Sequence, residues 1–186
     1  MSIRRLGSVG VAVFAACLVA GVTGSCAPIP DPTRYTIVAT PKESEFSGDL
    51  GATVPVFGLE QVIERRCGTL DCHGQVGRPF RIYSQNGLRE PTDADNEPGG
   101  APTTASEIKD NFESAVGLQP ELMSAVVTDP TNNPPDTLLL VRKPRQEERH
   151  KGGQVVVAGD DADTCMTSWL EGQIDTAACK AAAAVP

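Results

Sequence analysis

The feature that most constrains this chain is a short run that brings two thiols and an imidazole together. Cys67 and Cys72 are separated by four residues, and His73 and Gly74 follow at once, within RRCGTLDCHGQVG. Side chains of these types hold a covalent cofactor, bind a metal ion or close a disulfide loop. Each use requires different partners, so the rest of the chain must be searched for them.

The N-terminus has the pattern of a bacterial export signal. A basic start, MSIRR, precedes an apolar stretch over residues 6–22, and small residues precede Cys26. The segment VTGSC resembles a lipobox, although Thr23 stands where a large aliphatic residue is usual. We therefore predict a signal peptide over residues 1–25 and lipidation of Cys26. The protein would then be exported to the periplasm or cell envelope and held by a lipid anchor, with the outer membrane favoured.

The next segment, residues 26–54, is rich in proline, serine, threonine and glycine. This composition is typical of a flexible linker and predicts a tether for a lipid-anchored domain. The remaining residues, 55–186, are of the usual size for one domain.

The charge of the chain limits its partners. The net charge is −8, and removal of a signal that holds Arg4 and Arg5 but no acid lowers it to −10. Such a charge argues against binding to nucleic acid and suits solubility or a basic partner. Aromatic residues make up only 4% of the chain, so we expect a small core to be reinforced by a cofactor or by disulfides.

Four cysteines remain if Cys26 carries lipid: Cys67, Cys72, Cys165 and Cys179. An exported chain meets an oxidising compartment, and four cysteines allow three pairings. We favour a bond between Cys165 and Cys179, because it would tie the C-terminal tail to the preceding helix. Closing a loop of this length stabilises a protein by roughly 3 kcal/mol in the chain-entropy model.

Apolar residues recur at helical spacing in several segments. Helices are predicted over residues 56–66, 106–116 and 120–127, and from Asp160 or Asp161 to a stop at Gly172. Residues 75–104 are dense in glycine, proline, aspartate and asparagine and predict a long loop with at most a small strand. The segment DTLLLVRKP fits either helix or strand. The fold class expected is therefore mostly α, as a single domain with long irregular loops.

A covalent haem is one use of the cysteine–histidine run. Two thiolates add to the vinyl groups, and the adjacent imidazole reaches the iron. The second axial ligand is usually histidine or methionine. His150 is the only other histidine, whereas Met123 and Met166 are the methionines that remain after the signal is removed. The common signature has two residues between the cysteines, and this chain has four.

Two other uses stay open at this point. A disulfide between Cys67 and Cys72 would give a cofactor-free, disulfide-stapled domain that serves as a binding or structural module. Zinc could be bound by the same cysteines together with His73 and His150, although the adjacent side chains of Cys72 and His73 diverge and make poor joint ligands. No serine lies in a nucleophile elbow, and GGAPTT and HKGGQ lack phosphate-loop spacing, so we do not expect an enzyme.

Four weak motifs, in order, resemble a known family. The run CGTLDCHG, the segment DPTNNPPDTLLL, the segment HKGG and the terminal SWLEG are similar to motifs of planctomycete-type cytochrome c domains, and also of cytochrome-like exported lipoproteins of myxobacterial type. The resemblance covers residues 56–172 with gaps. The matching positions are Cys67, Cys72, His73, Gly74, Pro130, Leu138 to Leu140, His150, Gly152, Gly153, Trp169, Leu170 and Gly172.

The resemblance implies a cytochrome c-like fold and a function. Cys67 and Cys72 would hold haem c, His73 would be the proximal ligand and His150 the distal ligand. The protein would then transfer single electrons to or from a redox protein partner in the envelope.

Overall fold

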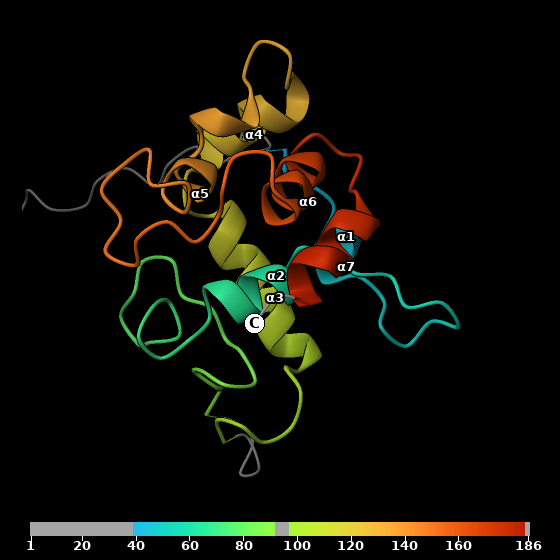
Figure 1. Ribbon diagram of the computed structural model, residues 1–186, viewed down its shortest axis with the longest axis vertical. Coiled ribbons are helices and arrows are strands. Elements are labelled where there is room, and N and C mark those ends of the chain that lie inside the picture. The colour runs from blue at the N-terminus through green and yellow to red at the C-terminus, as the bar shows by residue number, and fades with distance from the viewer. Residues whose placement is uncertain (1–38, 92–96, 185–186) are drawn as a thin grey trace, which may run out of the picture. The chain divides into compact units, whose positions relative to one another are not determined.

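The computed structural model describes residues 39–91 and 97–184, which are mostly helical (Figure 1). No strand occurs among these residues, and only isolated β-bridges link parts of the loops. The predicted mostly α class is confirmed. The elements are α1 (Glu43–Ser47), α2 (Glu60–Arg66), α3 (Ala105–Val116), α4 (Pro120–Thr128), the 3-10 helix η2 (Pro135–Thr137), α5 (Leu139–Arg142), α6 (Asp161–Leu170) and α7 (Thr176–Ala184).

The predicted signal peptide, Cys26 and the first part of the predicted tether lie outside the described residues. None of the helices in the described ranges has the length and apolar character needed to cross a membrane.

The folded part begins before residue 55, the boundary that the composition predicts. Helix α1 lies inside the predicted tether, yet the side chain of Phe46 is 0% exposed. Trp169 anchors the same region, because its indole Nε1 donates to the carbonyl oxygen of Lys42 at 3.1 Å. The prediction of a tether through residue 54 is therefore corrected: one buried phenylalanine in a polar segment is enough to draw it into the core.

Three aromatic rings form the centre of the core. The ring centre of Phe46 lies 5.6 Å from that of Phe112 and 5.4 Å from that of Trp169, in edge-on and tilted arrangements that such rings favour. These residues come from α1, α3 and α6. Three of the eight aromatic residues of the chain thus meet where three helices join.

The helix ends follow local chemistry. Helix α2 begins at Glu60 rather than at residue 56. Before it, the backbone of α1 passes so close to Gly58 that a side chain there would overlap the carbonyl of Phe46. Asp160 caps α6 by accepting a hydrogen bond from the amide of Asp163 at 2.8 Å. Gly172, with φ of +76°, ends the α6 segment as predicted, because glycine adopts this conformation without strain.

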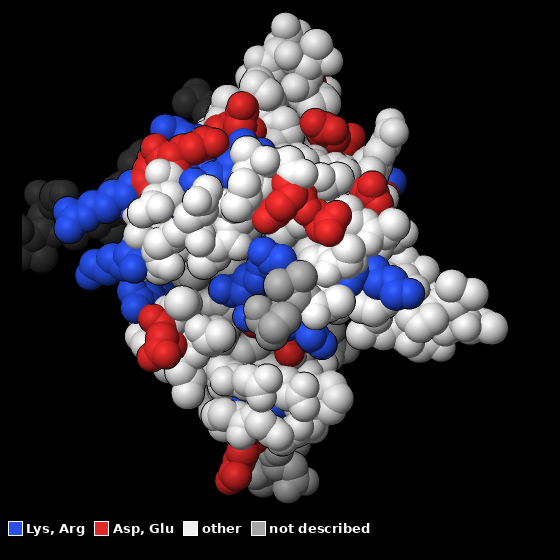
Figure 2. Space-filling model, in the orientation of Figure 1, with Lys and Arg blue, Asp and Glu red and all other residues white. Residues whose placement is uncertain are grey.

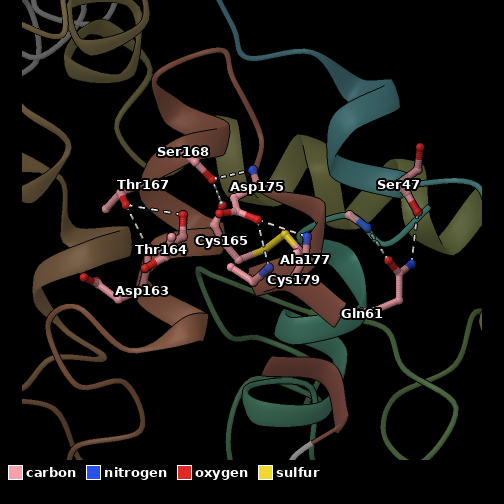
Figure 3. Close-up of a disulfide and its surroundings, with 12 residues drawn as sticks. Ser47, Gln61, Asp163, Thr164, Cys165, Thr167, Ser168, Asp175, Ala177 and Cys179 are labelled. Atoms are coloured by element: carbon pink, nitrogen blue, oxygen red, sulfur yellow. Dashed lines mark hydrogen bonds between the residues drawn. A yellow bond between two sulfur atoms is a disulfide. The ribbon is translucent and has the colours of Figure 1, made fainter. Parts of the chain in front are cut away.

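The C-terminal tail forms a helix that the apolar spacing did not predict. Asp175 caps α7 by accepting from the amides of Ala177 and Ala178 at 3.0 Å each (Figure 3). The alanine-rich sequence that follows has a high intrinsic helix propensity. Helix α7 packs against α6 and α2. The predicted disulfide between Cys165 and Cys179 is present and joins α6 to α7, with both cysteines 0% exposed.

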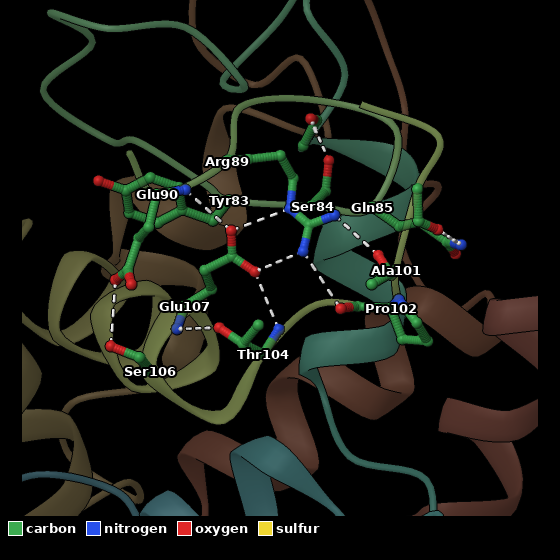
Figure 4. Close-up of polar contacts among 12 residues, drawn as sticks. Tyr83, Ser84, Gln85, Arg89, Glu90, Ala101, Pro102, Thr104, Ser106 and Glu107 are labelled. Atoms are coloured by element: carbon green, nitrogen blue, oxygen red, sulfur yellow. Dashed lines mark hydrogen bonds and ion pairs between the residues drawn. The ribbon is translucent and has the colours of Figure 1, made fainter. Parts of the chain in front are cut away.

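An ion pair holds the long loop to the start of α3 (Figure 4). Arg89 donates to both carboxylate oxygens of Glu107 at 2.9 and 3.0 Å, and to the carbonyls of Ala101 and Pro102. Glu107 also accepts from the amide of Thr104, whose hydroxyl accepts from the amide of Glu107 in return, which forms a capping box. Burial acts to raise the pKa of Glu107, but the bonds from Arg89 prevail and hold it down at about 2.

A second buried polar group joins α2, α3 and the loop. The amide of Asn111 donates to Glu60 at 2.8 Å and to the carbonyl of Tyr83 at 2.8 Å, and its oxygen accepts from the amide of Tyr83 at 2.7 Å. Asn111 and Glu60 are both 0% exposed. These bonds take the place of the small strand that the sequence allowed around residue 82.

The disulfide gives the first prediction. Replacing both Cys165 and Cys179 by serine should lower the free energy of unfolding by roughly 3 kcal/mol, because the unfolded chain regains the freedom of a closed loop. The midpoint of urea denaturation measures this. Reduction of the unmodified protein should reproduce the loss, and a reduced protein with an unchanged midpoint would contradict the prediction.

The ion pair gives the second prediction. Arg89→Met leaves the buried carboxylate of Glu107 without its cation and should cost roughly 3–5 kcal/mol in the free energy of unfolding. The matched control is Lys109→Met in the same helix, because the pair of Lys109 with Glu113 is exposed and should change stability by less than about 0.5 kcal/mol. Equal effects of the two substitutions in denaturant titrations would disprove the proposed role of Arg89.

Candidate functional site

A cavity of about 430 Å³ lies beside the end of α2, a volume within the range of small-molecule sites. Its lining includes both cysteines of the predicted motif and both histidines of the chain. The walls are apolar and come from α2, α5, α6 and two loops; the main contributors are Leu59, Ile63, Phe80, Leu140, Val155 and Met166. The two loops, residues 67–80 and 143–156, lie on the same side of the molecule in Figure 1, coloured green and orange.

The first loop is a compact turn that follows directly after α2. Cys67 ends α2, with its amide bonded to the carbonyl of Ile63 at 2.8 Å. The amide of His73 returns to the carbonyl of Cys67 at 2.9 Å, and the amide of Cys72 bonds to the carbonyl of Thr69 at 3.0 Å. The four residues between the cysteines therefore form a closed, hydrogen-bonded loop that brings His73 back next to α2.

Glycines allow this loop to pack against the chain that follows. A side chain on Gly74 or on Gly87 would overlap the carbonyl oxygen of Gly68. That same oxygen accepts a hydrogen bond from the hydroxyl of Ser84 at 2.6 Å. The glycine after His73 is thus required by backbone contact, whatever the site binds.

The imidazole of His73 is fixed by its Nδ1 atom, which lies 2.7 Å from the carbonyl oxygen of Phe80. The Phe80 ring also packs edge-on against it, with ring centres 4.9 Å apart. Because a carbonyl only accepts, Nδ1 carries the proton and Nε2 is left with its lone pair in the neutral ring. Burial lowers the pKa of His73, which favours the neutral form that binds metals.

The imidazole of His150 is fixed in the same way by its own turn. Its Nδ1 lies 2.8 Å from the carbonyl oxygen of Gly153, while the amide of Gly153 donates to the carbonyl of His150 at 3.1 Å. Gly153 has a φ of +74°, which glycine adopts freely. A Cβ on Gly152 would lie 3.1 Å from Cε1 of His150, so a glycine at this position leaves room for the imidazole ring.

The two imidazoles lie close together and nearly parallel. Their ring centres are 6.1 Å apart, and their planes differ by 12°. The rings are thus stacked in one cavity, close enough for a single bound group to contact both.

Cys67 and Cys72 are free thiols and are not bonded to each other. Burial, with a smaller contribution from the nearby Cys72, raises the pKa of Cys67 to about 12, so this thiol is protonated at neutral pH.

Arg66 links the two sides of the cavity. Its guanidinium donates to the carbonyl of Val155 at 3.0 Å and to that of Ala182 at 3.5 Å, and it lies 3.9 Å from the carboxylate of Asp160. The residue that precedes Cys67 is thus bonded to the segment that follows His150. Arg66 falls within the helix that the sequence predicts over residues 56–66, but sequence reasoning assigned it no role.

The two methionines considered as metal ligands lie in different places. Met166 lines the cavity, whereas Met123 is buried in the core away from it. Within residues 39–91 and 97–184, no group of three or more histidine, cysteine or acidic side chains is placed to hold a metal ion. Two thiols and two fixed imidazoles therefore line one mostly apolar cavity.

Sequence reasoning thus named four residues that the fold brings to one cavity: Cys67, Cys72, His73 and His150. Cys165 and Cys179 do not line it and serve the disulfide between α6 and α7. The carbonyl groups that orient the two imidazoles were not foreseen, because backbone acceptors leave no sequence signal.

Comparisons of the chain with protein-family models, with curated proteins and with solved structures found no match.

Proposed function

We propose that this chain is an exported, lipid-anchored protein with a cytochrome c-like fold that holds one covalent haem and transfers single electrons at the cell envelope. The observation that carries the proposal is the pair of fixed imidazoles, 6.1 Å apart, in a cavity that also contains both thiols of the Cys67–His73 run. Export and the lipid on Cys26 rest on the N-terminal sequence alone.

Each residue then has a defined task. Cys67 and Cys72 would attach the haem, and His73 and His150 would bind its iron. When bound, haem supplies an iron that gains or loses one electron within a fixed structure. The chain orients both ligands through carbonyl oxygens at Nδ1, which also raises the basicity of each Nε2. The mostly apolar walls lower the polarity around the site, which together with ligand identity tunes a redox potential.

Haem attachment is tested on the exported chain produced with a c-type haem maturation system. We expect a pyridine haemochrome spectrum of c-type haem and a mass increased by one haem. Replacing both Cys67 and Cys72 by serine should abolish covalent attachment, whereas the Cys165→Ser/Cys179→Ser variant should keep it and lose only stability.

A chain without a Soret band, and with a mass two disulfides below that of the reduced form, would overturn the proposal. The cofactor-free module with a Cys67–Cys72 bond would then be the function to pursue.

The axial ligands are tested separately. His150→Ala should leave the haem attached but shift its spectrum from low spin to high spin, because the iron loses one strong-field ligand. Met166→Leu is the matched control at the same cavity and should leave the low-spin spectrum unchanged. The opposite pattern, a high-spin spectrum for Met166→Leu and a low-spin spectrum for His150→Ala, would show that Met166 and not His150 is the second ligand of the iron.

A further inference from the structure

Basic side chains surround the cavity that holds the two histidines. Asp71 is the only acid among the described residues that line it. The cations that line it are Arg66, Arg78, Lys143, Arg149 and Lys151. This local excess is opposite in sign to the net charge of −8.

Four of these cations are not paired with a carboxylate in residues 39–91 and 97–184, although Nζ of Lys143 donates to the carbonyl oxygen of Arg149 at 3.4 Å. Arg66 is held by the contacts described above, but Arg78, Lys143, Arg149 and Lys151 form no ion pair with any carboxylate of the described residues. Arg78, Arg149 and Lys151 are exposed, and Lys143 is half-buried. We call these four the basic collar. Figure 2 shows basic side chains along the left edge of the molecule, over the loops of Figure 1 that carry His73 and His150.

The basic collar lies next to the proposed electron-transfer site. Arg149 and Lys151 flank His150 in the sequence, and Arg78 lies near enough to His73 to contribute to the lowering of its pKa. Any protein that exchanges electrons with a cofactor between the two histidines must come close to this mouth. Like charges at the contact would repel it, and opposite charges would orient it.

We propose that the basic collar is the docking surface for an acidic patch of a redox partner protein, an inference that rests on the proposed function. An extended polyanion such as nucleic acid, or an anionic membrane surface, would also meet the acidic remainder of the protein and be repelled. A protein with a localised acidic patch matches the limited size of the basic collar. The partner is thus of the opposite charge to the one that the composition of the whole chain suggests.

The test measures binding of a decaglutamate peptide to the isotope-labelled exported chain at low ionic strength, by amide chemical shifts, under ascorbate so that bound iron stays ferrous. We expect shifts in residues 71–80 and 143–152 that disappear in high salt. The Arg149→Glu/Lys151→Glu variant should bind roughly tenfold more weakly. The matched control, Arg65→Glu/Lys180→Glu, changes the net charge equally at exposed sites outside the cavity and should bind like the unmodified chain.

Equal weakening by the two double variants would overturn the proposal, because binding would then follow net charge alone. Saturation of the same shifts by free glutamate at equal carboxylate concentration would also overturn it, in favour of a small-anion site. The visible spectrum of the same sample reports the haem independently. A chain that binds the peptide at the basic collar but has no haem band would refute the proposed function and leave the docking surface in place.

Discussion

The guanidinium of Arg66 is the contact on which the architecture of the site depends. It ends α2, one residue before the first thiol of the cavity, and it bonds to the backbone on the far side at Val155 and to the last helix at Ala182. Because both acceptors are carbonyls of other segments, this one side chain sets the spacing between the loop of His73 and the loop of His150. A cation on an otherwise apolar helix face is costly unless its charge and donors are matched, and Asp160 with the two carbonyls provides most of that match.

Polar contacts elsewhere stabilise parts of the fold that a larger hydrophobic core would stabilise in other domains. The long segment between α2 and α3 contains no strand in its described residues, and it is held to α3 by two buried polar side chains, Asn111 and Arg89. Each satisfies several backbone groups at once, which irregular chain cannot do by itself. This solution suits a protein with few aromatic residues, only three of which meet at the junction of α1, α3 and α6.

The sequence was most informative where a pattern repeats or where residue chemistry is rare. Helical spacing predicted α3, α4 and α6 to within a residue or two, and two histidines and a cysteine pair predicted which side chains share a cavity. Helices α1 and α7 were not predicted, because their burial depends on residues far away in the sequence. The ring of Phe46 packs against Trp169, and α7 packs against α2. The basic collar was not predicted either, because its residues come from two loops that are far apart in the chain.

The buried carboxyl of Glu60 gives the folded domain a dependence on the acidity of its surroundings. One of its oxygens is bonded to Asn111, and the other has no hydrogen-bond partner. Burial raises the pKa of Glu60 from 4.5 to about 8. Between these values the unfolded chain has released a proton that the folded chain still holds, so folding takes up a proton and the free energy of unfolding falls as the pH rises. Through this one group, the folded domain is more stable in a mildly acidic medium than in an alkaline one.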